Sequence, residues 1–155
     1  LPAVDDVSFT LERGRILGLV GESGSGKSVT GFSIMGLVDA PGRIVGGEIL
    51  FQGRELVGMK PREMRTLQGN RIAMIFQEPT TALNPTFTIG AQLRAVYRSH
   101  RGRDAAAAQA RARYLLDKVG ITDGARRLEQ YPHELSGGMR QRVLIAMALM
   151  CAPDL

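Results

Sequence analysis

The hydrophobic pattern along the chain is dominated by short apolar segments that predict β-strands. Residues 7–11 alternate apolar and polar side chains, as in a half-buried strand. Residues 16–20 and 72–76 are apolar without interruption, which is typical of parallel strands buried on both faces. Residues 48–51 predict a further strand, followed by a turn at Gln52-Gly53. The pattern therefore indicates an α/β fold.

Helices are predicted where apolar side chains recur every three to four residues. Residues 89–97 place them at positions i, i+4, i+7 and i+8, as in an amphipathic helix. A second such helix is expected from Asp104, which suits the N-cap, to Val119, with Gly120 as the C-terminal cap. Further helices are expected over residues 29–38, 61–67 and 136–150, the last of them capped by Ser136.

Length and composition restrict the class of protein. A chain of 155 residues with 44% apolar and 23% charged residues fits one globular domain rather than a disordered segment. Its longest uncharged apolar run, residues 143–153, is too short to span a membrane. No secretory signal is visible at the start. The single cysteine, Cys151, fits a reducing compartment.

The net charge of +5 is concentrated in residues 91–130, which contain nine basic and four acidic residues. Such a stretch fits a solvated helical face, and it also fits a surface that meets nucleic acid or anionic lipid. No interleaved aromatic residues support base stacking. The basic residues are Arg94, Arg98, Arg101, Arg103, Arg111, Arg113, Lys118, Arg126 and Arg127.

A glycine-rich segment after the predicted strand 16–20 matches a phosphate-binding loop. Residues 21–28 read Gly-Glu-Ser-Gly-Ser-Gly-Lys-Ser, the pattern G-x-x-x-x-G-K-[ST]. Glycines let backbone N–H groups approach phosphate oxygens, and the helix that follows directs its positive end at the anion. Lys27 adds a full positive charge, and the Ser28 hydroxyl is a hard oxygen ligand that suits Mg²⁺. The segment predicts binding of a nucleoside triphosphate.

A second glycine motif lies at the start of the last predicted helix. Leu135-Ser136-Gly137-Gly138 begins 108 residues after Lys27 and would present free amides to another anion. One chain cannot easily wrap both motifs around one nucleotide, so a second chain is plausible. A plain N-cap followed by two permissive glycines is the alternative interpretation.

Together, the phosphate loop, the Leu-Ser-Gly-Gly segment and Gln77 at the end of a predicted strand resemble the ATP-binding-cassette (ABC) ATPases. The resemblance covers essentially the whole chain. Residues 74–79 with 83–85, and residues 131–134, resemble the dipeptide, oligopeptide and nickel importer branch. The resemblance implies an α/β P-loop core with a small antiparallel β part and a helical subdomain. It divides the chain into an ATP-binding core (1–77), a helical subdomain (78–135) and a signature helix (136–155).

The resemblance also implies roles for individual residues. ATP would be bound through the loop and the first residue after it, and Mg²⁺ through Ser28 and Gln77. Lys27 and Gln77 would act in hydrolysis. The amide of Gln77 suits this role, because it can donate and accept hydrogen bonds without carrying charge. The implied nucleotide-binding residues are Gly21, Glu22, Ser23, Gly24, Ser25, Gly26, Lys27, Ser28 and Val29 in one subunit, with Ser136, Gly137 and Gly138 acting on the opposite subunit's ATP.

The implied partners are a second ABC subunit and transmembrane permease subunits. The implied location is peripheral, at the cytoplasmic face of a membrane. Because the basic residues fall in the helical subdomain, membrane-subunit or lipid proximity is favoured over nucleic acid, and no direct nucleic-acid contact is expected.

Several family features are missing from this sequence. Met139 stands where the family usually has Gln, and the chain stops before the family's Walker B strand and catalytic glutamate. The adenine-stacking aromatic residue and the switch histidine are missing too, and His100 and His133 match no such motif. We therefore expect a truncated cassette that exposes apolar surface, is marginally stable, binds ATP weakly at best and does not hydrolyse it.

Two other ABC ATPases are alternatives. A chromosome-maintenance or DNA-repair ATPase would place coiled-coil arms between the two motifs, and 108 residues leave no room for them. A soluble cassette protein that acts on the ribosome would carry a second cassette on the same chain. A small-molecule kinase is disfavoured, because nothing in that class needs Leu-Ser-Gly-Gly at a helix start.

Overall fold

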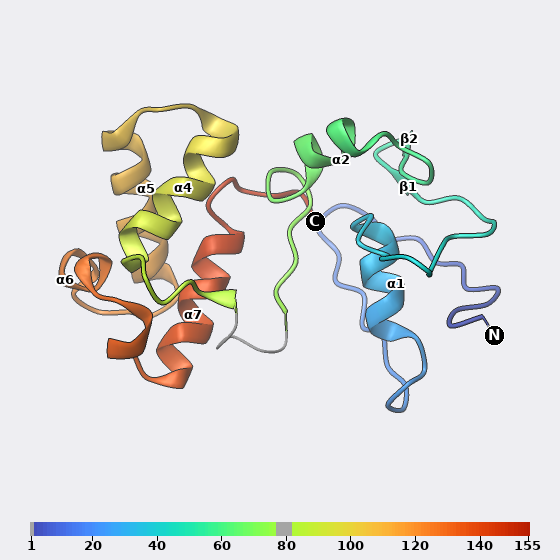
Figure 1. Ribbon diagram of the computed structural model, residues 1–155, viewed down its shortest axis with the longest axis horizontal. Coiled ribbons are helices and arrows are strands. Elements are labelled where there is room, and N and C mark those ends of the chain that lie inside the picture. Colours follow the sequence, from blue (N-terminus) through green and yellow to red (C-terminus); the bar gives the residue numbers. More distant parts are fainter. Residues whose placement is uncertain (1, 77–81) are drawn as a thin grey trace. The chain divides into compact units, whose positions relative to one another are not determined.

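The computed structural model describes residues 2–76 and 82–155, which form two compact units (Figure 1). We call residues 1–64 the N-terminal unit and residues 65–155 the C-terminal unit. The phosphate loop belongs to the first unit and the signature motif to the second. The predicted Gln77 lies outside the described residues.

The N-terminal unit contains one longer helix and a small β-hairpin. Helix α1 spans Lys27–Ile34, and helix α2, Pro61–Leu67, crosses from this unit into the next. Strands β1 (Leu50–Phe51) and β2 (Arg54–Glu55) pair antiparallel around the predicted turn at Gln52-Gly53. The Glu55 carboxylate accepts hydrogen bonds from the N–H groups of Ile49 and Val57, at 3.0 and 2.8 Å, and closes the hairpin.

Two predicted strands of this unit are not formed. Residues 7–11 and 16–20 have no strand pairing, and Ile16 and Val20 are 98% and 91% exposed instead of buried. An apolar run becomes a strand only when a neighbouring segment supplies backbone partners. No such partner is found for residues 16–20 in the part of the chain that the structure describes. The predicted burial of this run is therefore wrong for this structure.

The C-terminal unit is helical. It contains α4 (Ile89–Arg101), α5 (Ala105–Lys118), α6 (Gly124–Glu129), a 3₁₀ turn at Pro132–Glu134 and α7 (Gly137–Ala148). The predicted caps of α5 and α7 agree with the structure, since Asp104 accepts from the Ala107 N–H and Ser136 from the Met139 N–H. Helix α6 and the 3₁₀ turn were not predicted, because each is too short to show a hydrophobic period.

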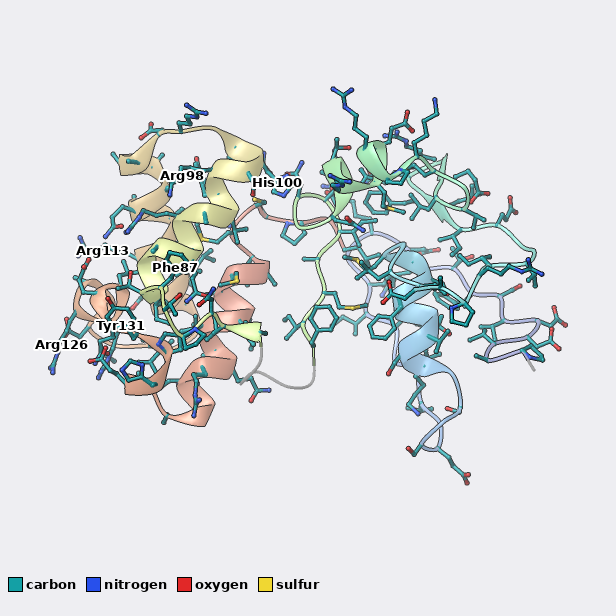
Figure 2. All side chains as sticks on the ribbon, viewed as in Figure 1. Phe87, Arg98, His100, Arg113, Arg126 and Tyr131 are labelled. Atoms are coloured by element: carbon teal, nitrogen blue, oxygen red, sulfur yellow. The ribbon has the colours of Figure 1, made fainter. Side chains whose placement is uncertain are left out.

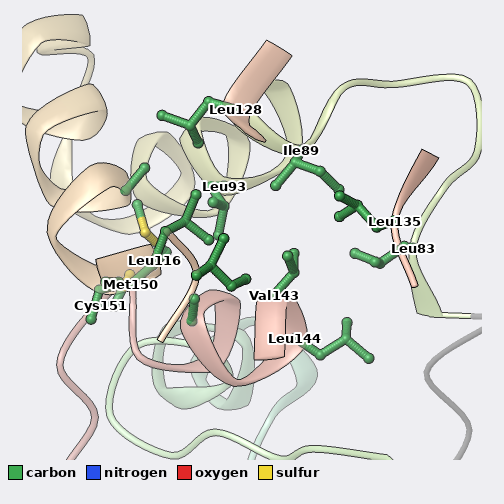
Figure 3. Packing of buried hydrophobic residues seen from close by; sticks show 14 residues of the cluster. Leu83, Ile89, Leu93, Leu116, Leu128, Leu135, Val143, Leu144, Met150 and Cys151 are labelled. Carbon is green, nitrogen blue, oxygen red and sulfur yellow. The ribbon is translucent and has the colours of Figure 1, made fainter. Parts of the chain in front are cut away.

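The core of the C-terminal unit forms where α4, α5, α6 and α7 meet (Figure 3). Leu93, Leu116, Leu128 and Val143 are completely buried there, each contributed by a different helix. Burying a side chain of this size is worth about 1.5–3 kcal/mol. Among the described residues, the N-terminal unit buries only Met35, Leu56 and Met64 to a comparable degree.

Residues 72–76 fulfil the strand prediction only in part. Ile72 is 2% exposed and forms an isolated parallel bridge with Gln68. The Ala73 N–H donates to the Leu155 carbonyl at 2.8 Å, and the Leu155 N–H donates to the Arg71 carbonyl at 3.2 Å. These two bonds place Leu155 between residues 71 and 73, which is the hydrogen-bond pattern of parallel pairing. Ile75 and Phe76, at the other end of the predicted strand, are about half exposed.

Candidate functional site

The phosphate loop leads directly into α1 in the N-terminal unit. Gly26 occupies the N-cap position in a left-handed conformation, and the helix begins at Lys27. The Thr30 N–H and hydroxyl both donate to the Gly26 carbonyl, at 2.9 and 3.0 Å, and tie the end of the loop to the first turn of the helix. The sequence motif does not include Thr30, and only its position one turn after Gly26 could have indicated this role.

Gly26 must be glycine for two reasons. Its φ of +87° lies in the region that side chains disfavour, and a Cβ atom there would lie 2.6 Å from the Ala3 carbonyl oxygen. Gly24, with a φ of +83°, has open space around it, so its requirement is conformational only. The predicted importance of these two glycines therefore has different causes at the two positions.

The Lys27 side chain folds back over the loop. Its ammonium group donates to the carbonyl oxygens of Gly21 and Glu22, at 2.8 and 2.6 Å, and to the Ser25 hydroxyl at 3.1 Å. An ammonium group has three N–H donors, so the loop itself uses its full donor capacity. A full positive charge is thus held at the centre of the loop, where the motif predicts the outer phosphates.

The loop presents several backbone donors with no protein acceptor. Within the described structure, the Ser25 N–H of this loop donates a hydrogen bond to the Glu22 carbonyl at 3.2 Å. No acceptor is found within residues 2–76 and 82–155 for the N–H groups of Gly24, Gly26 and Lys27. Together with the positive end of α1, these groups form a concave set of donors that suits an anion. The predicted loop residues therefore have the geometry of an anion cradle.

A cavity of about 300 Å³ lies beside the loop within the same unit. Gly21, Ser25, Lys27 and Thr30 line one part of it, and residues 3–5 with Val7, Leu19 and Val20 line the rest. The segment before the predicted strand 7–11 thus contributes to the site. Sequence reasoning did not assign residues 3–5, because their types carry no recognisable chemistry.

The hydroxyl of Ser28, the predicted magnesium ligand, is on an exposed residue at the start of α1. The other predicted ligand, Gln77, lies outside the described residues. No group of three or more His, Cys, Asp or Glu side chains that could hold a metal ion exists within the described chain.

The signature motif forms the start of α7 in the C-terminal unit. Leu135 is 4% exposed and packs in the core, whereas Ser136, Gly137 and Gly138 are exposed. The Ser136 hydroxyl accepts from the Met139 N–H at 3.3 Å, which fixes the first turn. The buried leucine anchors the motif, and the exposed residues present it to solvent.

The two histidines do not contribute to either motif. His133 is exposed in the 3₁₀ turn, where its ring stacks on that of Tyr131 at 5.7 Å between centroids. His100 lies near the end of α4, with its Nε2 atom close to Gly69. The placement of His133 agrees with the prediction of a surface or loop residue, whereas His100 is half-buried and lies within α4.

Within the described residues, no helix combines the length and apolar character that crossing a bilayer requires.

Comparison with known proteins gives consistent matches over nearly the whole chain. Residues 4–155 match the family model of the ABC transporter domain. The chain is 49% identical over 153 residues to the dipeptide transport ATP-binding protein DppD of Escherichia coli strain K12, covering 99% of this chain and 47% of that protein. It is 51% identical over 153 residues to the oligopeptide transport ATP-binding protein OppD of Salmonella typhimurium strain LT2, covering 99% and 45%. The chain thus spans about half the length of these curated relatives.

Solved structures give a matching result. A dimeric bacterial ABC transporter cassette superimposes with a TM-score of 0.84 at 26% identity, over 97% of this chain and 62% of that one. The same cassette in a dimeric post-hydrolysis state bound to ADP and Pi superimposes with a TM-score of 0.83.

Proposed function

Because the chain belongs to the ABC transporter family, we propose that it is part of the ATP-hydrolysing subunit of a transporter that imports peptides or a similar small solute. The proposal rests chiefly on one observation. The loop 21–28 combines free backbone donors, the positive end of α1 and the Lys27 ammonium around one concave surface. The transported class is taken from the named relatives, which are dipeptide and oligopeptide transport proteins.

In this proposal, residues 21–29 bind the phosphates of ATP. The free N–H groups of Gly24, Gly26 and Lys27 would donate to phosphate oxygens, and the Lys27 ammonium would balance the charge of the outer phosphates. The lysine would act by its position and its charge, since its Nζ is held by acceptors of the loop. Residues of the cavity beside the loop would face the rest of the nucleotide.

Ser28 is exposed at the start of α1 and fits a magnesium ligand, because hydroxyl oxygen is a hard donor. Gln77 is the second proposed ligand. When bound, Mg²⁺ neutralises charge that develops on the phosphates during transfer to water. The chain's own contribution is to hold the triphosphate in line and to supply fixed donors around it.

The signature residues Ser136, Gly137 and Gly138 would contact the ATP held by a second cassette. The dimeric state of the related cassette structures supports this arrangement. The permease subunits of a membrane transporter would be the other partners, and the proposed location is the cytoplasmic face of a membrane. A role on DNA or on the ribosome is not favoured, since the named relatives are transport proteins.

The decisive experiment measures ATP hydrolysis and peptide uptake by the assembled transporter with Lys27→Ala. We expect hydrolysis and uptake to fall to background, because the charge at the centre of the loop is lost. Lys60→Ala is the matched control, since Lys60 is an exposed lysine of the same unit. Equal hydrolysis by the Lys27 variant and the control would overturn the proposal. Uptake of nickel instead of peptide, with hydrolysis intact, would correct only the transported class.

A further inference from the structure

The C-terminal end of the signature helix is held by arginines from two neighbouring helices. Arg111 of α5 donates through Nη2 to the Leu149 carbonyl at 2.9 Å and through Nε to the Met150 carbonyl at 3.4 Å. Arg101, the last residue of α4, donates through Nη2 to the Cys151 carbonyl. All three carbonyls belong to residues that follow directly after α7.

The three carbonyls belong to the turn that follows α7, and the Leu149 carbonyl also accepts from the Ala152 N–H at 3.0 Å. The last carbonyls of a helix point away from it and carry its partial negative charge, so guanidinium groups stabilise them by hydrogen bonding and by charge. Met150 and Cys151 are 2% and 1% exposed, so water has little access to these two residues, whereas Leu149 is 39% exposed. The arginines therefore supply hydrogen-bond donors to carbonyls that water would otherwise solvate.

The contact between α5 and α7 is reciprocal. Arg142 of α7 donates to the Gly120 carbonyl, just after the end of α5, at 3.0 Å. Each of these two helices thus places an arginine on the other's C-terminal end. Two such contacts at separate points resist sliding of one helix along the other, which apolar packing alone resists weakly because it is not directional.

The two clamping arginines are oriented for this role. The Arg111 guanidinium also lies 5.5 Å from the centroid of the Tyr114 ring, one turn along α5. The ion pairs found among the described residues, Arg54–Glu63 and Arg71–Asp154, use other arginines. Arg101 and Arg111 therefore direct their hydrogen bonds at main-chain carbonyls and not at carboxylates.

The opposite end of the same helix carries the signature. Helix α7 has 12 residues, so it is about 18 Å long. A shift of its C-terminal end along the axis is transmitted to Ser136, Gly137 and Gly138, because a helix of this length moves as a rigid body. Hydrogen-bond donors must be placed to within a fraction of an ångström to stabilise a developing charge.

We propose that Arg101 and Arg111 are positioning residues that set the axial position of the signature helix and thereby the reach of its N-terminal amides toward the partner's nucleotide. This inference rests on the proposed function, since it needs a signature that acts on ATP. It gives two of the basic residues in segment 91–130 a role in the rate of ATP hydrolysis. The other reading of that excess, a surface for lipid or nucleic acid, does not account for these two side chains.

The test compares two double variants in the assembled transporter. The first, Arg101→Met with Arg111→Met, removes both guanidinium groups and keeps an unbranched apolar stem at each position. The matched control, Arg98→Met with Arg113→Met, removes one exposed arginine from each of the same helices, α4 and α5 (Figure 2). Both double variants change the net charge equally.

We expect the clamp variant to lose at least about tenfold in kcat for ATP hydrolysis. Its affinity for ATP, measured without turnover, should stay within about twofold, because the phosphate loop is unchanged. The control should keep both values. Arg111→Lys, which retains the charge and one donor, should recover part of the lost kcat. Hydrogen exchange at residues 149–152 should accelerate in the clamp variant alone.

An unchanged kcat in the clamp variant, with faster exchange at residues 149–152, would overturn the inference. A parallel loss of ATP affinity would also overturn it, since that result indicates general unfolding. If the double variant does not fold, the single variants Arg101→Lys and Arg111→Lys carry the same comparison. A wild-type transporter that does not hydrolyse ATP would refute the proposed function instead, so the two failures are distinguishable.

Discussion

The two units of this chain reach order in different ways. The C-terminal unit pairs its backbone within helices and buries leucines from four of them in one core. The N-terminal unit contains the more distinctive motif, yet its longest apolar runs are exposed and lack strand partners. Helices satisfy their N–H and C=O groups locally, whereas strands depend on segments far away in sequence. A chain segment can therefore carry a fully shaped functional loop without carrying a formed sheet around it.

The largest expected difference is in the cost of deleting apolar side chains. Leu93→Ala empties a completely buried position of the C-terminal unit and should lower the free energy of unfolding by about 2–5 kcal/mol. Ile16→Ala removes a side chain that is 98% exposed and should change it by less than about 0.5 kcal/mol. Urea unfolding of the 155-residue chain, with hydrogen exchange read in each unit, gives both values. A cost for Ile16→Ala equal to that of Leu93→Ala would show that the N-terminal unit has a packed core after all.

The second prediction concerns the shape of the phosphate loop. Gly26→Ala should strain the loop by about 1–3 kcal/mol and abolish measurable ATP binding, since a methyl group would meet the Ala3 carbonyl at a disfavoured φ. Gly46→Ala is the control, because that glycine has open space around it and lies in the same unit. Titration with a fluorescent ATP analogue measures the nucleotide affinity of both variants. Normal binding by the Gly26 variant would mean that the described loop conformation is not the one that binds.

A smaller effect separates stability from function at the signature. Ser136→Ala removes the N-cap of α7 and should cost about 1 kcal/mol of stability. Ser136→Asp retains a capping oxygen, so the free energy of unfolding should stay close to that of the wild type. In the assembled transporter the aspartate should nevertheless lower ATP hydrolysis, because a carboxylate repels phosphate. Unimpaired hydrolysis by the aspartate variant would argue against a signature that meets the nucleotide.

The smallest predicted effect is a pH dependence confined to the hairpin of the N-terminal unit. Hydrogen bonds from the Ile49 and Val57 N–H groups hold the pKa of Glu55 below its ordinary value, because they favour the ionised carboxylate. The unfolded chain then binds protons more readily, so this contribution is present above the ordinary pKa. It is lost as the pH falls through the lowered pKa of the folded state. NMR titration of Glu55 measures the pKa, and Glu55→Gln should remove the pH dependence of hydrogen exchange at residues 49–57. A Glu55 pKa at or above the ordinary value would contradict the prediction.

Much of the helical part could be predicted from the sequence. The predicted helix over residues 61–67 has the same bounds in the structure, and the caps at Asp104 and Ser136 are confirmed by their hydrogen bonds. These features depend on neighbours within four residues, which a sequence displays directly. Burial of residues 16–20 could not be predicted in the same way, since it depends on which distant segment pairs with them.

The candidate site shows the same division. The phosphate loop and the signature were predicted from spacing, because their residue types are fixed by the chemistry of anion binding. The contacts of Thr30 with Gly26, and the cavity lining from residues 3–5, were not predicted. The contacts of Arg101 and Arg111 with the end of α7 were not predicted either, since the sequence does not indicate which acceptor an arginine in a basic stretch will contact.

The three hydrogen bonds of the Lys27 ammonium have a consequence for the energetics of ligand capture. Because the cation already has acceptors, an incoming phosphate substitutes for carbonyl and hydroxyl oxygens and does not fill an electrostatic void. The net gain in binding free energy is then the difference between two sets of contacts of the ammonium group. One set is with the carbonyl and hydroxyl oxygens of the loop, and the other is with phosphate oxygens. Such an exchange keeps the empty loop in the described conformation and reduces the net free energy gained when an anion binds.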